Sequence, residues 1–123
     1  DLAARRVNLE TDAECIACNW WHLLTVDPEF MKNWRASKFP GGCAHACELE
    51  TSVYLYFDED NVRKDKIADG EIAFHRDRSD FQWVDLFAAG PGTPVSWTAS
   101  YSDSGILGQA SLATKEKGEA VVR

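Results

Sequence analysis

The sequence has no hydrophobic run close to the roughly 20 residues that a membrane-spanning helix needs, so it predicts no membrane segment. It also lacks clusters of lysine and arginine: 13 basic residues stand against 20 acidic ones, and the formal charge is −7. Phosphate binding needs gathered positive charge, so nucleic acid is excluded as an expected partner. Residues 1–6 lack the apolar core of a signal peptide, and we expect a cytoplasmic protein.

What the chain does contain is typical of one globular domain. Hydrophobic residues make up 45% of its 123 residues and charged residues 27%, which disordered chains do not show. Aromatic residues are plentiful, and large rings either fill a core or line a pocket. Residues 58–66 mix acidic and basic side chains, and we interpret this stretch as solvated surface.

The four cysteines are Cys15, Cys18, Cys43 and Cys47. Without an export signal a disulfide framework is not expected, which leaves a zinc site or buried thiols. Cys15 and Cys18 form one closely spaced pair, and Cys43 and Cys47 form another with His45 between them. These spacings superficially fit a zinc site. If Cys15 and Cys18 lie on a strand, however, they point to opposite faces and cannot hold one ion. Buried thiols are therefore the favoured interpretation.

The first third of the chain predicts three elements. Residues 1–10 contain good helix formers and no helix breaker, so they predict a helix. Residues 15–21 form an apolar run suited to a buried strand. Asp27 as cap and Pro28 at the first position predict a second helix, which ends before the Pro- and Gly-rich turn at 39–42.

The remaining elements are less sharply defined. Residues 43–57 combine a helical hydrophobic repeat with many β-branched and aromatic residues, so helix and strand both stay open. Residues 68–98 predict loops and short strands, such as 70–75 and 81–87. Residues 111–123 predict a final helix.

The densest group of reactive side chains is His45, Glu48 and Glu50, directly after the turn at 39–42. A histidine and two carboxylates in so short a segment can serve as metal ligands or as an acid–base set. On a helix His45 and Glu48 share a face, whereas on a strand Glu48 and Glu50 do. Surface carboxylates beside a hydrogen-bonded histidine are the plainer alternative.

Residues 45–52, His-Ala-Cys-Glu-Leu-Glu-Thr-Ser, resemble the creatininase-family signature Asp-x-His-Ala-Gly-Glu-x-Glu-Thr-Ser. Residues 1–6 resemble the helix after the family's Asn-Gly-His-Gly-Gly-Asn segment, and residues 19–21 resemble the end of the next strand. Residues 104–118 are similar to the family's closing Gly-Val-x-Gly and Ala-Thr-x-Glu-x-Gly pattern. The resemblance covers almost the whole chain in sequence order.

The resemblance implies an α/β fold: a three-layer α/β/α sandwich with a mostly parallel sheet, of which residues 1–123 form the C-terminal portion. It also implies hydrolysis of a non-peptide amide, a linear or cyclic C–N bond, at a centre of two divalent ions (Zn, Mn or Fe). Most ligands of those ions would come from an N-terminal half of the same enzyme. We therefore expect that half as a partner, and a homo-oligomer of such pairs.

Individual roles follow from the same resemblance. His45 matches the catalytic histidine that passes a proton to the leaving nitrogen, and Glu50 matches the carboxylate that supports it. Glu48 matches a glutamate that we expect to be a metal ligand. Trp20 or Trp21 matches an aromatic wall of the substrate pocket, although both rings could equally belong to a core.

Three departures from the family pattern put the substrate in doubt. Cys43 stands at a substrate-binding position where the family usually has Asp, Cys47 replaces Gly, and Gln109 replaces Asp. Two further functions therefore stay open. One is hydrolysis of a C–C bond in a cyclic diketone on the same scaffold, and the other is a non-catalytic subunit or binding module that has lost the metal site.

Overall fold

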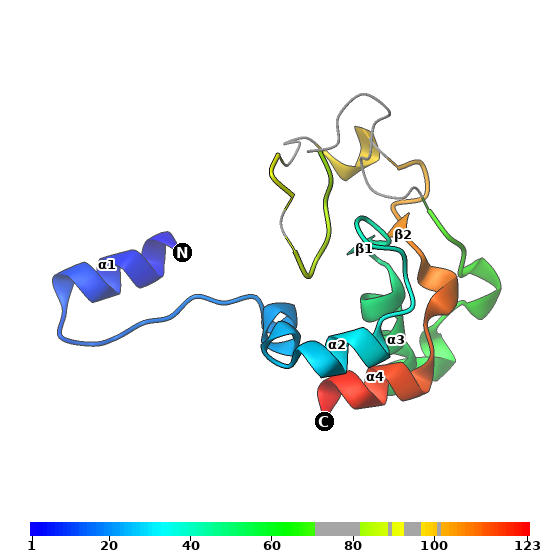
Figure 1. The fold of residues 1–123 in the computed structure, drawn as a ribbon, viewed down its shortest axis with the longest axis horizontal. Coiled ribbons are helices and arrows are strands. Elements are labelled where there is room, and N and C mark those ends of the chain that lie inside the picture. Colours follow the sequence, from blue (N-terminus) through cyan, green and yellow to red (C-terminus); the bar gives the residue numbers. More distant parts are fainter. Residues whose placement is uncertain (71–81, 89, 93–96, 101) are drawn as a thin grey trace.

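The fold consists of four α-helices, a small sheet and several short 3₁₀ helices in the part of the chain that the structure describes (Figure 1). The computed structural model describes residues 1–70, 82–88, 90–92, 97–100 and 102–123. The α-helices are α1 (Leu2–Glu10), α2 (Pro28–Trp34), α3 (Glu48–Asp58) and α4 (Lys115–Val122), and the strands are β1 (Cys43–His45) and β2 (Leu107–Gly108). The 3₁₀ helices are Trp20–Val26, Glu59–Asn61, Lys64–Lys66, Thr98–Ser100 and Ala110–Leu112.

The sheet is two-stranded and antiparallel. Cys43 lies opposite Gly108 and His45 lies opposite Leu107, with an irregularity in the register between them. Gly108 has a φ of 119°, and a Cβ there would collide with the carbonyl of Gly42, so the pairing needs glycine. A mostly parallel sheet is not present in the described part of the chain, so the three-layer sandwich stays a prediction.

The N-terminal helix is confirmed as α1, but the strand predicted at 15–21 is wrong. Residues 15–19 have no regular structure, and Trp20–Val26 is a 3₁₀ helix. Asn8 on α1 accepts a hydrogen bond from the Cys15 amide (2.6 Å) and donates one to the Cys15 carbonyl (2.9 Å). The Asn8 side chain thus forms the hydrogen bonds with the Cys15 amide and carbonyl that a neighbouring strand would otherwise have formed.

The predicted start of α2 is confirmed. Asp27 caps the helix, because its Oδ1 accepts hydrogen bonds from the amides of Glu29 (3.0 Å) and Phe30 (3.1 Å). Pro28 occupies the first helical position, where no amide hydrogen is required. The helix ends where Arg35 adopts an extended conformation.

The ambiguous segment at 43–57 contains both elements, a three-residue strand and then a helix. Ala46, with a φ of 49°, turns the chain between β1 and α3. In α3 the buried residues Glu48, Leu49, Ser52 and Leu55 recur at helical spacing. Of the short strands predicted further on, residues 82–87 contain only a single bridge, between Gln82 and Gly92, and residues 71–81 lie outside the described part.

A final helix is confirmed as α4, although it begins at Lys115 and not at residue 111, and it packs closely against α3 (Figure 1). Thr114 caps α4 by accepting a hydrogen bond from the Lys117 amide (3.2 Å), while the Thr114 amide donates to Ser52 Oγ (3.2 Å). A Cβ on Gly118 would collide with the carbonyl of Ser52 and lie 2.8 Å from the Tyr56 Cβ. Gly118 therefore sets how closely the two helices approach.

The main core lies between α2, α3 and the β1–α3 corner. Trp34, Cys43, Cys47 and Leu49 form its buried centre, and rings and aliphatic side chains from α2 and α4 pack around them. Cys43 and Cys47 are joined by a disulfide, so the expectation of free thiols is wrong for this pair. Only four positions separate them along the chain, and the turn at Ala46 brings their Cα atoms to 5.1 Å.

The zinc hypothesis is not supported either. Cys15 and Cys18 are free and lie between α1 and the 3₁₀ helix Trp20–Val26, and Cys18 is exposed, so the expectation of buried thiols is wrong for Cys18. Within the described ranges no group of three or more His, Cys, Asp and Glu side chains is placed to hold a metal ion.

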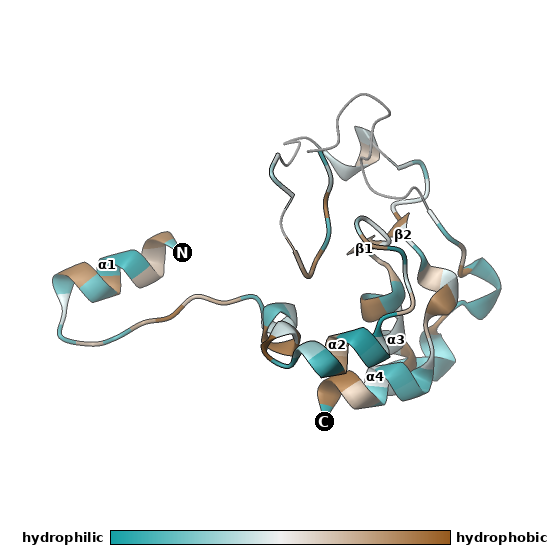
Figure 2. Cartoon of the chain, viewed as in Figure 1, coloured by the Kyte–Doolittle hydropathy of each residue, from teal (hydrophilic) through white to brown (hydrophobic). Residues whose placement is uncertain are grey.

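Helix α1 stands apart from the remaining helices and buries none of its residues (Figure 1). Figure 2 shows hydrophobic residues on α1 and on the run that follows it. Large apolar side chains exposed there include Leu2, Leu9, Ile16, Leu23 and Val26. Among the described helices, none is long and apolar enough to cross a membrane.

The disulfide predicts a simple labelling pattern. Alkylation of the denatured, unreduced protein should modify two thiols, Cys15 and Cys18, because Cys43 and Cys47 are bonded to each other. After reduction, intact-mass measurement should show four modified thiols. Four modified thiols without reduction would contradict the bond.

The close approach of α3 and α4 predicts an unusual response to alanine. Gly118→Ala should destabilise the protein by about 1–3 kcal/mol, because the added methyl group meets the backbone of Ser52. Helix propensity alone predicts the opposite, a gain of about 1 kcal/mol. Thermal unfolding distinguishes the two, with the exposed α4 substitution Ala120→Gly as the control for propensity. Stabilisation by Gly118→Ala would refute the packing argument.

Candidate active site

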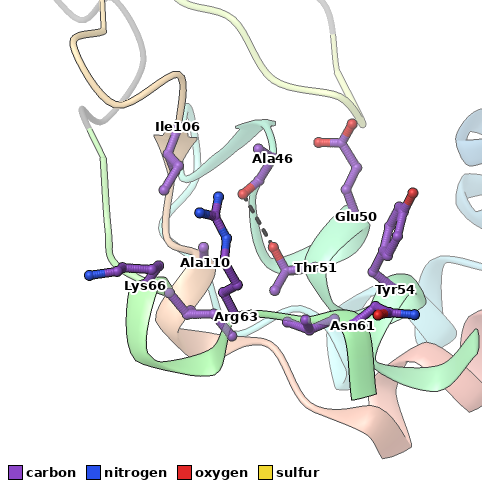
Figure 3. Close-up of a pocket in the computed structure, with 11 residues that line it drawn as sticks. Ala46, Glu50, Thr51, Tyr54, Asn61, Arg63, Lys66, Ile106 and Ala110 are labelled. Atoms are coloured by element: carbon purple, nitrogen blue, oxygen red, sulfur yellow. Dashed lines mark hydrogen bonds between the residues drawn. The ribbon is translucent and has the colours of Figure 1, made fainter. Parts of the chain in front are cut away.

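A pocket of about 420 Å³ opens at the N-terminal half of α3, beside the 3₁₀ turns that follow this helix (Figure 3). Its polar and charged walls include Glu50, Thr51, Tyr54, Arg63 and Lys66, and Ile106 closes one side. Thr51 Oγ1 donates a hydrogen bond to the carbonyl of Ala46 (3.3 Å), which fixes the turn that leads from β1 into the pocket wall. A pocket of this size and mixed lining suits a small polar molecule.

His45 is the residue before Ala46 and does not itself line this pocket. It ends β1 and is exposed, and the next residue, Ala46, lines the pocket. The strand is held on both sides, because Cys43 is bonded to Cys47 and His45 is paired with Leu107. The structure thus presents the predicted catalytic histidine to solvent from a rigid corner.

Glu50 lies in the first turn of α3 and lines the same pocket. Its Oε2 is buried and, among the described residues, has no hydrogen-bond partner. Both Glu50 and His45 are described, and no hydrogen bond joins them. Glu50 therefore keeps one buried carboxylate oxygen without a hydrogen-bond partner among the described residues.

Glu48 is placed very differently, because it is completely buried. Lys117 Nζ forms an ion pair with its Oε1, the Ala36 amide donates to Oε1 (3.0 Å) and the Ser37 amide donates to Oε2 (2.9 Å). Burial by itself raises the pKa of Glu48, but the hydrogen bonds from Lys117, Ser37 and Ala36 together outweigh it and hold the pKa below its ordinary value. Both oxygens are thus already used inside the protein, and the metal-ligand role stays a prediction.

The other predicted site residues do not line this pocket. Trp20 is half-exposed, and its ring packs edge-on against Trp21 with the centroids 5.9 Å apart. Trp21 packs against the main core. Cys43 is fully buried in its disulfide, which removes its thiol from contact with a ligand. Of the predicted site residues, Glu50 lines the pocket and His45 adjoins it in sequence through Ala46, whereas the two tryptophans and Cys43 do not line it.

A second buried ion pair holds the loop that precedes β1. The Arg35 guanidinium donates to both oxygens of Asp85 (2.8 and 2.6 Å), and Asp85 also accepts from the amides of Gly41 (2.9 Å) and Phe87 (3.1 Å). Bidentate pairs of this kind fix geometry as well as charge. Gln109 adds a further link, because its Oε1 accepts from the Lys38 amide (2.7 Å).

Sequence reasoning missed the basic wall of the pocket. Arg63 and Lys66 belong to the stretch interpreted as solvated surface, and only the fold of the 3₁₀ turns brings them beside α3. No local signal distinguishes Arg63 from its charged neighbours. Sequence reasoning also missed Lys117. A signal was present in this case, because Lys117 lies within the segment that resembles the family's Ala-Thr-x-Glu-x-Gly pattern.

A family model described as Creatininase: creatinine amidohydrolase matches residues 1–123. The chain belongs to the creatininase family. No curated protein matches it, and no solved structure does either. Family membership implies hydrolase activity of the amidohydrolase type.

Enzymes of the creatininase family are generally metal-dependent, which requires side chains that can coordinate metal ions. No cluster of three or more candidate ligands occurs in the described residues. Glu48, the residue predicted as a ligand, has its oxygens engaged by Lys117 and two backbone amides. The described residues therefore do not form a metal centre by themselves.

The buried pair predicts a marked and pH-dependent effect of Glu48→Gln. Removing the charge should leave Lys117 without its partner and cost about 3–5 kcal/mol in the free energy of unfolding. Because folding lowers the pKa of Glu48, the contribution of this residue is present at neutral pH and is lost as the pH falls below its ordinary value of about 4.5. Urea unfolding at several pH values measures both effects.

The control is Glu29→Gln, which removes a carboxylate that is exposed and pairs only with Lys32 among the described residues. This substitution should change the free energy of unfolding by no more than about 0.5 kcal/mol, since exposed ion pairs contribute little to stability. The difference between the wild type and Glu48→Gln should shrink toward acidic pH. The claim that the ion pair stabilises the fold would be contradicted if this difference in the free energy of unfolding were small at neutral pH or grew as the pH fell.

Proposed function

We propose that the chain carries the proton-transfer side of an amidohydrolase that cleaves a non-peptide amide, a linear or cyclic C–N bond. The observation that supports the proposal is that the exposed His45 directly precedes Ala46, which lines a pocket together with Glu50, and that Glu50 Oε2 is buried without a hydrogen-bond partner among the described residues. An imidazole can give or accept a proton near neutral pH, which the departing nitrogen of an amide requires. A carboxylate without a partner can bind an N–H group.

The chemistry of the two residues follows from amide hydrolysis itself. A water molecule adds its oxygen to the carbonyl carbon, the C–N bond breaks, and the nitrogen must gain a proton to leave as an amine. His45 accepts the proton that the attacking water loses and passes it to that nitrogen, and Glu50 accepts a hydrogen bond from the substrate N–H and so orients the nitrogen. The rigid corner at Ala46 holds both residues relative to the pocket.

We further propose that the reaction depends on divalent ions, Zn, Mn or Fe, with two per site as in the family pattern. The described residues do not provide the ligand set, so an N-terminal half of the same enzyme would supply most of it. Such ions would supply an activated water molecule. The proposed setting is the cytoplasm.

The exposed apolar residues around α1 support a partner of this kind. Leu2, Leu9 and Ile16 are each more than three-quarters exposed, which a protein surface seldom tolerates in one region. An N-terminal half that packs on α1 and the following run would bury them, and it would add the strands of a three-layer sandwich. A homo-oligomer of such pairs is part of the same proposal.

A second candidate, a non-catalytic subunit or binding module, is favoured by the engagement of Glu48 and Cys43. Lys117 and two amides use the Glu48 oxygens, and the disulfide uses Cys43. Two of the predicted site residues are therefore committed to the scaffold. An assembled protein that neither binds a divalent metal nor hydrolyses any amide offered to it would favour this candidate over the hydrolase.

The hydrolase proposal predicts that His45→Ala lowers kcat by about 10²- to 10⁴-fold, because the leaving nitrogen loses its proton donor. The measurement uses the protein assembled with its N-terminal half, first with creatinine and then with other cyclic and linear amides. Bound metal, measured by elemental analysis, should be nearly unchanged. His22→Ala is the matched control, because His22 is also exposed but lies on the 3₁₀ helix Trp20–Val26, far along the chain from Ala46 and Glu50.

Retention of full activity in His45→Ala would overturn the assignment of the proton donor. Stoichiometric loss of metal in the same variant would instead place His45 among the ligands. A comparable loss of activity in His22→Ala would show that the effect is not specific to His45.

A further inference from the structure

Arg63 stands out among the arginines of the described chain. Arg6, Arg35 and Arg123 each form an ion pair with a carboxylate, whereas Arg63, like Arg5 on the isolated helix α1, forms none with a described residue. The chain carries a net charge of −7, so an arginine without a carboxylate partner is not the result of a shortage of acids. Unlike Arg5, Arg63 lines the largely aliphatic pocket beside α3.

The pocket contains side chains of opposite charge that do not pair with each other. Glu50 and Arg63 both line it, yet no ion pair joins them. Figure 3 shows the Arg63 guanidinium pointing toward Ala46 and Ile106, while the Glu50 carboxylate lies beyond Ala46 on its other side. Aliphatic side chains also line the space around the charged positions, namely Val62, Ile67 and Ala110. A ligand that carries an N–H donor at one end and an anion at the other would pair with both charges at once.

The two ends of the pocket differ in the groups that they can accept. Glu50 repels an anion and accepts an N–H donor, whereas Arg63 offers planar paired donors that match a carboxylate. Thr51 Oγ1 already donates to the Ala46 carbonyl, and the Asn61 amide nitrogen donates to Asp58, so neither donor competes with the guanidinium for an anion.

Lys66 adds positive charge to the same wall of the pocket. Its ion pair with Asp65 is long, at 3.6 Å, and both side chains are exposed. Such a pair holds its members only weakly, so the Lys66 ammonium is available to an anion bound at Arg63.

We propose that this pocket binds a small molecule that carries an amide N–H at one end and a carboxylate at the other, with Arg63 holding the carboxylate. The inference rests on the proposed function for the role of Glu50 at the amide nitrogen. It goes further by naming the charge of the substrate and the residue that selects it. Arg63 touches a remote group of the ligand and not the bond that breaks, so it determines specificity.

The experiment compares two probes that differ only in charge, N-acetylglycine and N-acetylglycinamide. The isotopically labelled protein is titrated with each, and backbone amide shifts are followed at Ala46, Thr51 and Arg63. N-acetylglycine should shift these signals saturably and bind at least about 10-fold more tightly than the neutral amide, because charge-assisted hydrogen bonds to Arg63 are strong. Neither titration requires turnover or a metal ion.

Variants assign the effect to the guanidinium. Arg63→Ala should weaken N-acetylglycine binding about 10-fold or more and leave the neutral probe unchanged, while Arg63→Lys should restore part of the affinity. Arg5→Ala removes the same charge from α1 and should change nothing. Equal binding of the two probes, binding that survives in Arg63→Ala, or no binding of either probe would each overturn the inference.

The outcome is separable from that of the proposed function. Charge-selective binding together with an inactive assembled enzyme would leave the anion site in place and refute the hydrolase. Amide hydrolysis that is equally fast for neutral and carboxylate-bearing substrates, and equally fast in Arg63→Ala, would support the hydrolase and refute the role of Arg63.

Discussion

The buried carboxylate of Glu48 is the interaction on which the arrangement of this chain depends. It gathers Lys117 from α4 and the amides of Ala36 and Ser37, which follow α2, at the first residue of α3. A buried charge is tolerated only when such partners surround it, so the three helices are held together as one unit. Lys117 contributes twice, because its carbonyl also accepts a hydrogen bond from the Trp34 indole (3.1 Å).

The candidate site is built on the outside of this unit. The disulfide between Cys43 and Cys47 and the pairing of β1 with β2 hold the corner at Ala46, so His45 and Glu50 emerge from a fixed turn. Two glutamates only two positions apart on α3 thus have different roles. Glu48 faces inward and stabilises the helices, whereas Glu50 faces the pocket and keeps an oxygen free.

Local signals predicted the helices well, because caps and helix formers act within a few residues. Asp27 and Pro28 located α2, and the final helix was found from its own composition. The prediction of a strand at 15–21 was wrong because an apolar run becomes a strand only when a neighbouring strand pairs with it. Here the Asn8 side chain forms the hydrogen bonds with the Cys15 backbone. The family motif pointed to His45 and Glu50, but it could not separate the inward Glu48 from the outward Glu50. Nor could it reveal the disulfide or the position of Arg63, since both depend on contacts made by the folded chain.

The central claim is that Glu48 belongs to the scaffold while His45 and Glu50 belong to the site. Anomalous X-ray diffraction from crystals of the protein assembled with the proposed N-terminal half, grown with Mn²⁺, tests this claim most directly. The account predicts that the Glu48 carboxylate lies within hydrogen-bond distance of Lys117 Nζ and the Ala36 and Ser37 amides, with no anomalous peak beside it. A manganese ion within about 2.5 Å of a Glu48 oxygen, with Lys117 displaced, would contradict the account.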